Sequence, residues 1–408
     1  MIIEKKSHKG LTPRSLFSFI ILLCFFLGSL NLINRYYYCI FVAALFFIVT
    51  PERKIRFNFD FLILMCFSLS ILLFDPSSQT MVTNMIKPFT YVLCYFMGLS
   101  LFSKSFERDT DLLWYEKRTS LLIYVVSAGV MLHFILNMIT NRSVQNRDVI
   151  DFWTKSAMSA TSQATLSCLM IAVSIAFLFS KVSKIKKVIA VVSLVMILAY
   201  NLILAGRTIF TLILIATGVA LFYTLCVKNL KSIKVVVIVL VVALLLMALY
   251  NSNVFGIKNA FEMSNFYDRF YGGDYTQDIN DDSRLENKLY YVEHFFDSML
   301  GGGHIRAKFG HSAHDLYLDT YDESGVFALI AIAVYIIKSI CRALKCARSK
   351  QLSFEMKMLL VCIYTIVNIQ FWLEPILRGV PWLLAAYCLI DGAVTRLLIE
   401  EKNIDSVS

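Results

Sequence analysis

The sequence has 408 residues, of which 58% are hydrophobic and 17% are charged, and its formal net charge is +10. Soluble proteins carry about a quarter charged residues, so this composition excludes an ordinary soluble globular protein. Apolar runs long enough to cross a bilayer recur along the chain, and such spans are helical because the membrane interior offers the backbone no other partner. We therefore expect an all-α polytopic membrane protein with about 12 transmembrane helices and one large external loop that contains short helices.

The expected spans follow one another from the first apolar run to the last. They cover residues 16–32, 36–50, 59–74, 89–102, 120–138, 157–180, 188–205, 209–227, 233–250, 326–341, 354–371 and 382–398. The chain then divides into an N-terminal membrane bundle (1–250), a large loop (251–325), and C-terminal membrane helices with a tail (326–408).

Basic loops predict the orientation of these spans. The runs PERKIR (51–56), KVSKIKK (181–187), VKNLKSIK (227–234) and CRALKCARSK (341–350) fall on the same side of the predicted topology. Because short loops rich in Lys and Arg stay in the cytoplasm, both termini are expected there and the loop 251–325 is expected outside. Insertion and contact with anionic lipid explain the net positive charge, so it implies no nucleic-acid partner.

The large loop differs in composition from the rest of the chain. It holds 13 Asp and Glu against 6 Lys and Arg, and none of the ten cysteines, so no disulfide framework is indicated. Apolar residues at helical spacing predict an amphipathic helix over 284–300, on the membrane or against the bundle, that ends at three glycines. A second helix is expected to start near Ser312, with His314, Tyr317, Leu318 and Tyr321 on one face.

Two histidines of this loop carry candidate chemistry. His314, near a predicted helix start, has an imidazole that can act as a general base near neutral pH, although a solvated surface histidine is the plainer alternative. His311 lies three residues earlier with Asp315 and Asp319 nearby, which raises a zinc site as an alternative. No HExxH motif or cysteine pair accompanies them, so we expect no metal and no cofactor.

Three arginines are expected at the outer face. Arg207 opens a span after a very short turn, where a guanidinium is costly and so is often functional, the alternative being an arginine that snorkels to the interface. Arg284 begins the loop helix, and Arg378 lies in EPILRGVPW. Guanidinium groups bind phosphates in a bidentate manner, so the three are compatible with an anionic ligand such as a lipid diphosphate.

Three stretches together resemble the O-antigen ligase and polymerase superfamily of bacterial envelope glycosyltransferases. They are AGRTIFTLILIATGVALF, SRLENKLYYVEHFFDSMLGGG and HDLYLDTYDESG, in this order and on the same predicted side. The likeness covers most of the chain. Many ligases of the superfamily have His-Asn where this chain has His314-Asp315, so the branch is left open.

The resemblance implies a function and roles for the matching residues. It implies a metal-independent enzyme of the bacterial inner (plasma) membrane that transfers a glycan from undecaprenyl diphosphate at the outer face. His314 would activate the acceptor hydroxyl, while Arg207 and Arg284 would hold the diphosphate and stabilise its leaving charge. His311 and Arg378 would be accessory. Membrane lipids, a chain-length regulator and a flippase are the expected partners.

The long acidic loop favours a polymerase of lipid-linked repeat units in O-antigen or capsule synthesis over a ligase that transfers the glycan to lipid A core. A polysaccharide transporter or flippase is the alternative from another class, and a non-catalytic scaffold is a further one. Transporters use charges and broken helices at the membrane midplane. Here all six prolines fall at expected span ends, and His133 is the main polar exception within a span, which argues against ion-coupled transport.

Overall fold

The computed structural model describes residues 13–32, 36–50, 56–75, 82–101, 112–141, 148–204, 206, 208–227, 251–253, 257–262, 267 and 283–405. Helices make up nearly all of this part of the chain. They are α1 (Pro13–Ser29), α2 (Tyr36–Ile48), α3 (Phe59–Phe74), α4 (Val82–Ile86), α5 (Phe89–Leu101), α6 (Leu112–Thr140), α7 (Ala160–Phe179), α8 (Lys184–Ile203), α9 (Thr208–Cys226), α11 (Ile257–Glu262), α14 (Ser283–Glu293), the 3₁₀ helix η5 (Phe295–Ser298), α15 (His304–Phe309), α16 (Leu316–Arg348), α17 (Phe354–Leu373), α18 (Ile376–Gly379) and α19 (Pro381–Asp405).

Among the described residues, seven helices are long and apolar enough to cross a membrane, namely α6, α7, α8, α9, α16, α17 and α19. The protein is therefore an all-α, multi-span membrane protein. Four shorter apolar helices, α1, α2, α3 and α5, lie at the first four predicted spans. The ninth predicted span, 233–250, lies outside the described residues.

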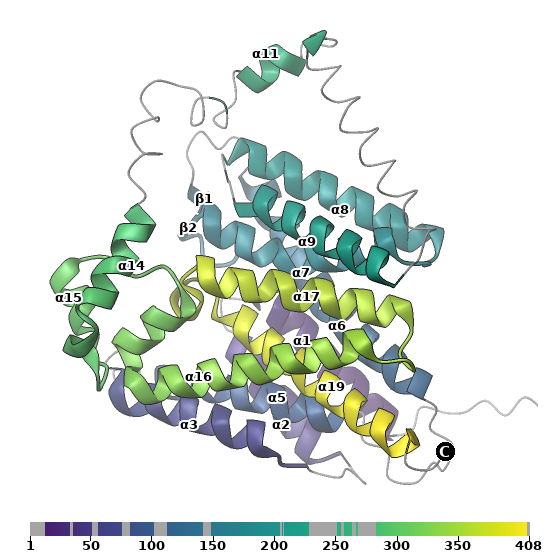
Figure 1. The fold of residues 1–408 in the computed structure, drawn as a ribbon, viewed down its shortest axis with the longest axis horizontal. Helices are drawn as coiled ribbons and strands as arrows, with labels where there is room; N and C mark the ends of the chain where they lie inside the picture. The colour runs from purple at the N-terminus through teal and green to yellow at the C-terminus, as the bar shows by residue number, and fades with distance from the viewer. Residues whose placement is uncertain are drawn as a thin grey trace, which may run out of the picture.

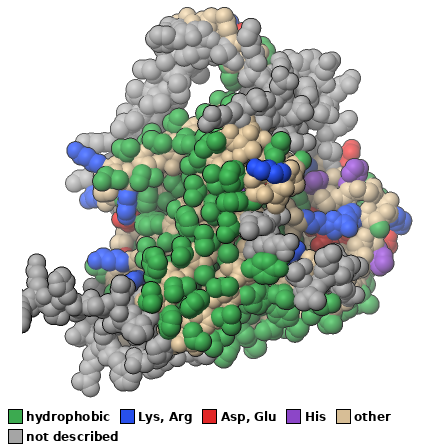
Figure 2. Space-filling model, turned by 180° about the vertical axis from the view of Figure 1, so that it is seen from behind, with side chains coloured by type: hydrophobic (Ala, Val, Ile, Leu, Met, Phe, Trp, Pro, Cys, Tyr) green, Lys and Arg blue, Asp and Glu red, His purple; other side chains and the backbone are tan. Residues whose placement is uncertain are grey.

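The central helices of the bundle are buried on nearly all sides, whereas the outer ones are not. In α7 and α19, 89% of the apolar window is buried inside the protein, against 28% in α8 and α9. In Figure 2 the outer surface is a broad apolar face, with charged side chains gathered toward its two ends. This distribution places α7 and α19 at the core of the bundle. In contrast, α8 and α9 expose most of their apolar side chains on its surface.

The helices run roughly parallel, so that their ends form two distinct regions (Figure 1). We call the region with α14, α15 and the start of α16 the loop end, and the opposite region the far end. A small antiparallel hairpin, β1 (Asp148–Ile150) with β2 (Ala157–Ser159), also lies at the loop end and was not predicted. Its two strands connect α6 to α7.

A buried charge network lies toward the far end and corrects one prediction. Arg342 of α16 donates from Nη1 to Asp60 of α3 at 2.7 Å and from Nε and Nη2 to Asp391 of α19, with the Nε distance 3.0 Å. Lys338 also contacts Asp60 at 2.7 Å, and the hydroxyl of Tyr364 donates to Asp391 at 2.6 Å. His133 is therefore not the main polar exception within the expected spans, because Asp391 lies in the span 382–398 and pairs with an arginine 49 positions away.

The loop helices differ in extent from their predictions. The helix expected over 284–300 ends at Glu293 and continues as η5, and the second helix begins at Leu316 rather than near Ser312. That later start follows from Asp315, whose side chain accepts a hydrogen bond from the backbone N–H of Leu318 at 2.7 Å and so caps α16. His314 therefore precedes the helix and does not share a face with Tyr317 and Tyr321 as predicted.

Candidate functional site

The glycine-rich stretch after η5 packs against a break in α16. Gly301, Gly302, Gly303 and Gly325 all have positive φ angles, and Gly325 interrupts the helix with φ 79° and ψ −179°. The backbone N–H groups of Gly302 and Gly303 donate to the carbonyls of Glu323 and Asp322 at 3.0 and 2.8 Å. Two motifs that are separate in the sequence thus form one backbone-to-backbone contact at the loop end.

Asp322 attaches α15 to this contact. One of its oxygens accepts from Ser298 Oγ at 2.7 Å and from the backbone N–H of Ile305 at 2.8 Å, and the other accepts from the N–H of Arg306 at 3.2 Å. A carboxylate at the start of a helix satisfies N–H groups that lack partners within that helix. The loop helices are therefore held on α16 by polar contacts as well as by packing.

His314 has a backbone conformation that few non-glycine residues adopt, with a φ of 58°. The residues on both sides of it are fixed. The N–H of Ala313 donates to Asp319 Oδ1 at 2.9 Å, and the buried Asp315 contacts Lys288 Nζ at 3.3 Å. Strained backbone of this kind persists where the surroundings hold it, often at functional sites. The half-buried imidazole is thus held in place by its neighbours in the chain.

Electrostatics keep this imidazole neutral near pH 7. Burial lowers the pKa of His314 below its ordinary value, and the positive charges of Arg284, His311 and Lys288 lower it further. A neutral imidazole has a nitrogen lone pair that can accept a proton. The structure therefore brings Arg284 within electrostatic range of His314, and the arrangement suits a general base.

Arg284 extends from α14 to the end of α17. Its Nη1 donates to the carbonyl of Leu373 at 3.1 Å, and its Nη2 lies 3.4 Å from Oε1 of the buried Glu374. Burial raises the pKa of Glu374, and Arg284 together with the hydroxyls of Thr161 and Thr208 opposes that rise. The Arg284 side chain is still 40% exposed, so its guanidinium can also meet a ligand from solvent.

Three further residues were predicted for the site, namely Arg207, His311 and Arg378. Arg207 lies outside the described residues, although Thr208, which follows it in the chain, begins α9 and hydrogen-bonds Glu374. His311 is exposed, and its carbonyl accepts from the hydroxyl of the buried Tyr291 at 2.9 Å. Arg378 does not join the group around His314, because its Nε donates to Glu323 of α16.

Two adjoining cavities open beside α18. The smaller, which we call the hairpin cavity, has a volume of about 270 Å³ and lies between the β1–β2 hairpin, α7, α2 and α19. The larger, which we call the arginine cavity, has a volume of about 530 Å³ and is lined by Lys87, Arg306 and Arg378 together with Asp75 and Glu323. Residues common to both linings are Tyr36, Arg378, Gly379 and Pro381.

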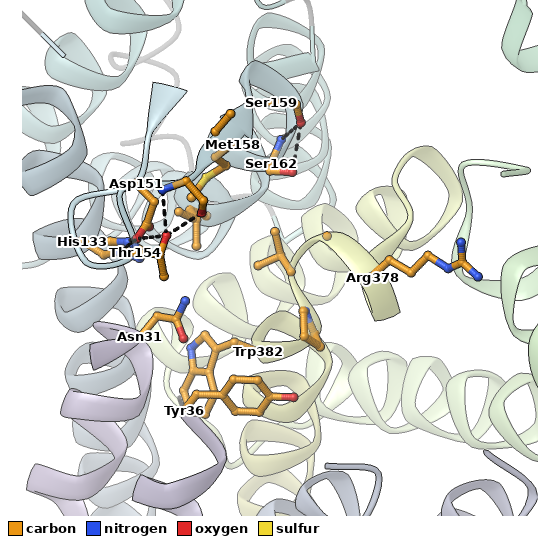
Figure 3. A pocket seen from close by; sticks show the side chains of 16 residues that line it. Asn31, Tyr36, His133, Asp151, Thr154, Met158, Ser159, Ser162, Arg378 and Trp382 are labelled. Atoms are coloured by element: carbon orange, nitrogen blue, oxygen red, sulfur yellow. Dashed lines mark hydrogen bonds and ion pairs between the residues drawn. The ribbon is translucent and has the colours of Figure 1, made fainter. Parts of the chain in front are cut away.

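A histidine–aspartate pair lines the hairpin cavity and was not predicted as a site. His133 Nε2 lies 2.8 Å from Asp151 Oδ2, and both side chains are buried. Figure 3 shows His133, Asp151 and Thr154 on one side of the cavity, opposite Tyr36 and Trp382. The sequence marked His133 only as a polar residue within a span, since nothing in it indicated that Asp151 would return to that helix.

Comparison with known proteins does not assign the chain to a family. No protein-family model matches the sequence, and no curated protein matches it significantly. Within the part of the chain that the structure describes, no group of three or more His, Cys, Asp or Glu side chains is arranged to hold a metal ion. The residues at the loop end are therefore the basis for assigning a function.

Proposed function

We propose that the protein is a membrane glycosyltransferase that polymerises undecaprenyl-diphosphate-linked oligosaccharide repeat units of a surface polysaccharide. The observation that carries the proposal is the electrostatic pairing of the strained His314 with the partly exposed Arg284 at the loop end, where both residues stand outside the linings of the two cavities. A lipid-linked substrate suits this position, because its tail can stay among apolar helices while its diphosphate meets arginines.

The chemistry follows from these groups. The acceptor sugar hydroxyl loses its proton to the imidazole of His314 as its oxygen attacks the anomeric carbon of the donor sugar. The bond between that carbon and the phosphate oxygen breaks, and the electron pair leaves with the lipid diphosphate. Arg284 and Arg207 would stabilise the charge that develops on this leaving group, which is work that preorganised cations perform well.

The proposal includes a membrane topology. Twelve spans would cross the bacterial inner membrane, with both termini cytoplasmic and the loop 251–325 facing the periplasm or exterior. Undecaprenyl-linked repeat units would reach the site from a flippase, and a chain-length regulator would act on the growing polymer. His311 and Arg378 would serve as accessory residues.

A reconstituted assay tests the enzyme class directly. Purified protein in detergent is mixed with lipid-linked repeat units, and the products are resolved by size. A polymerase produces a ladder of lengths without a compartment or an ion gradient, whereas a transporter produces no new glycosidic bond. No ladder, with His314→Ala cells still forming normal polymer, would refute the proposal.

A deletion in the source organism separates polymerase from ligase. Loss of a polymerase leaves lipid A core capped with single repeat units, whereas loss of a ligase leaves no glycan on the core at all. A polymerase is expected here, so single capped units are the predicted result.

A further inference from the structure

The lining of the hairpin cavity combines hydroxyl groups with aromatic rings. Hydroxyl and amide side chains line one part, namely Asn31, Thr154, Ser156, Ser159 and Ser162. Tyr36 and Trp382 form the aromatic part, with ring centroids 5.7 Å apart at an interplanar angle of 57°. A pyranose ring presents hydroxyls at its edge and an apolar face above and below, so both parts of this lining match it.

Two residues that line this cavity each carry a buried polar atom with no hydrogen-bond partner within the described residues. These atoms are Nδ1 of His133 and Nε1 of Trp382. Buried polar atoms without partners are rare and costly in native proteins, so their position here points to a ligand that supplies the missing partners.

The hydrogen-bond roles of these two atoms are opposite. Burial raises the pKa of Asp151, but hydrogen bonds from His133 and Thr154 outweigh it and lower the pKa to about 2. In the neutral form of His133, the hydrogen on Nε2 that an ionised Asp151 accepts leaves Nδ1 as an acceptor, whereas Trp382 Nε1 can only donate. A hydroxyl group both donates and accepts, so a ring that carries several hydroxyls satisfies both atoms.

The cavity is less suited to an anion. Arg378 borders it, but its side chain points away from the other lining residues, and its Nε donates to Glu323 (Figure 3). Asp151, the carboxylate in the lining, would repel a phosphate. The cationic side chains Lys87 and Arg306 line the neighbouring arginine cavity instead.

The first turn of α7 connects the hairpin cavity to Glu374, the residue that pairs with Arg284. Thr161 and Ser162 lie side by side at the start of α7, where the Thr161 hydroxyl bonds to Glu374, the partner of Arg284, and Ser162 lines the cavity. A sugar held there would be close to a diphosphate held by Arg284.

We propose that the hairpin cavity is a binding subsite for one pyranose ring of the lipid-linked glycan, with Tyr36 and Trp382 against the ring and His133 and Trp382 bonded to its hydroxyls. This inference rests on the proposed function. Donor and acceptor glycans of a polymerase share this chemistry, so either can supply the ring, and the experiment must distinguish them.

The test measures binding to protein in lipid nanodiscs with four probes. They are bare undecaprenyl diphosphate, undecaprenyl diphosphate bearing one N-acetylglucosamine, the same lipid bearing one galactose, and a soluble oligosaccharide of the repeat unit. The variant Ala157→Trp fills the cavity from an exposed position on β2. The matched control, Lys308→Trp, places the same ring at an exposed position on α15 that lines neither cavity.

At least one sugar-bearing lipid is expected to bind wild-type protein about tenfold more tightly than the bare lipid, because two hydrogen bonds and a ring contact are added. Ala157→Trp should remove this gain and leave bare-lipid binding unchanged, and Lys308→Trp should preserve it. A gain with lipid-linked sugars alone assigns the ring to the donor, whereas binding of the soluble oligosaccharide that Ala157→Trp abolishes assigns it to the acceptor.

The experiment distinguishes failure of the proposed subsite from failure of the proposed function. If wild-type protein forms polymer and binds the bare lipid, yet no sugar-dependent affinity is lost in Ala157→Trp, the subsite is refuted and the proposed function stands. If wild-type protein neither binds these lipids nor forms polymer, the proposed function itself fails.

Discussion

Gly301 and Gly325 lie against each other so closely that a Cβ atom on Gly301 would stand 2.6 Å from the carbonyl oxygen of Glu323 and 2.9 Å from the backbone nitrogen of Gly325. The φ angles are +84° at Gly301 and +79° at Gly325. With a ψ of −179°, Gly325 occupies a region that is essentially restricted to glycine. This contact sets the position of the loop helices on α16.

Substitution of Gly325 by alanine should therefore destabilise the protein by at least about 2 kcal/mol, since backbone strain and overlap with the carbonyl of Met299 add together. Unfolding in detergent, followed by circular dichroism against added denaturant, measures the change. Gly310→Ala is the matched control, because Gly310 also has a positive φ of +86° but nothing lies within 4 Å of its Cβ position. Equal losses in the two variants would show that the close contact contributes nothing.

His314→Ala should lower the rate of polymerisation by about 10²–10⁴-fold, the range for a lost general base, with lipid-diphosphate binding largely unchanged. His311→Ala, at an exposed position, should have a much smaller effect. Initial rates from the reconstituted assay provide the measurement. Comparable losses from the two substitutions would contradict the role given to His314.

The pH profile gives a second test of His314. Only the neutral imidazole can accept a proton, so activity falls at acidic pH as the group becomes protonated. Because burial and nearby cations lower the pKa of His314, this fall should lie below the ordinary histidine value of 6.5. Lys288→Gln removes one of those cations, so the acidic limb should move to higher pH. A shift toward lower pH would contradict the proposed electrostatics.

Asp151→Asn should reduce the free energy of unfolding by about 2 kcal/mol at pH 7, because the folded-state pKa of Asp151 is about 2 and its ordinary value is 3.8. The folded-state pKa is depressed, so this contribution is present above about pH 4 and is lost as pH falls toward 2. Stability curves of wild type and variant should thus converge in acid. Asp297→Asn, at a partly exposed carboxylate paired with Lys308, should change stability by well under 1 kcal/mol.

Arg342→Met should destabilise the bundle by about 3–5 kcal/mol, because it leaves the carboxylates of Asp60 and Asp391 buried without their shared partner. Adding Asp391→Leu should recover part of the loss by removing an unpaired buried charge. Lys186→Met, which breaks a half-exposed pair with Glu355, should cost less than about 1 kcal/mol. The free energy of unfolding in detergent distinguishes the three, and no recovery in the double variant would argue against charge burial as the cause.

Hydropathy predicted the helices well because membrane helices depend on long apolar runs, which are local in sequence. Helices occupy eleven of the twelve expected positions, and the remaining one, 233–250, lies outside the described residues. The start of α16 was placed a few residues too early, since the capping role of Asp315 was not distinguished from that of an ordinary polar residue.

The site was less predictable, because it depends on contacts between distant residues. Arg284 and His314 were chosen from separate motifs, and their separation in space could not be predicted from the sequence. The structure places Arg284 close enough to affect the pKa of His314, whereas Arg378 pairs with Glu323. The pair His133–Asp151 escaped notice because strands of three residues carry too little pattern to reveal a hairpin that returns to α6.

The ion network of Asp60, Arg342 and Asp391 fastens three helices together near one extremity of the bundle, while the cavities open at the other. Along α3 the distance from Asp60 to Asp75, which lines the arginine cavity, is about 22 Å for 15 residues at 1.5 Å each. Relative movement of α3, α16 and α19 is therefore most restricted at this extremity, because separating the helices there would break the hydrogen bonds of Arg342.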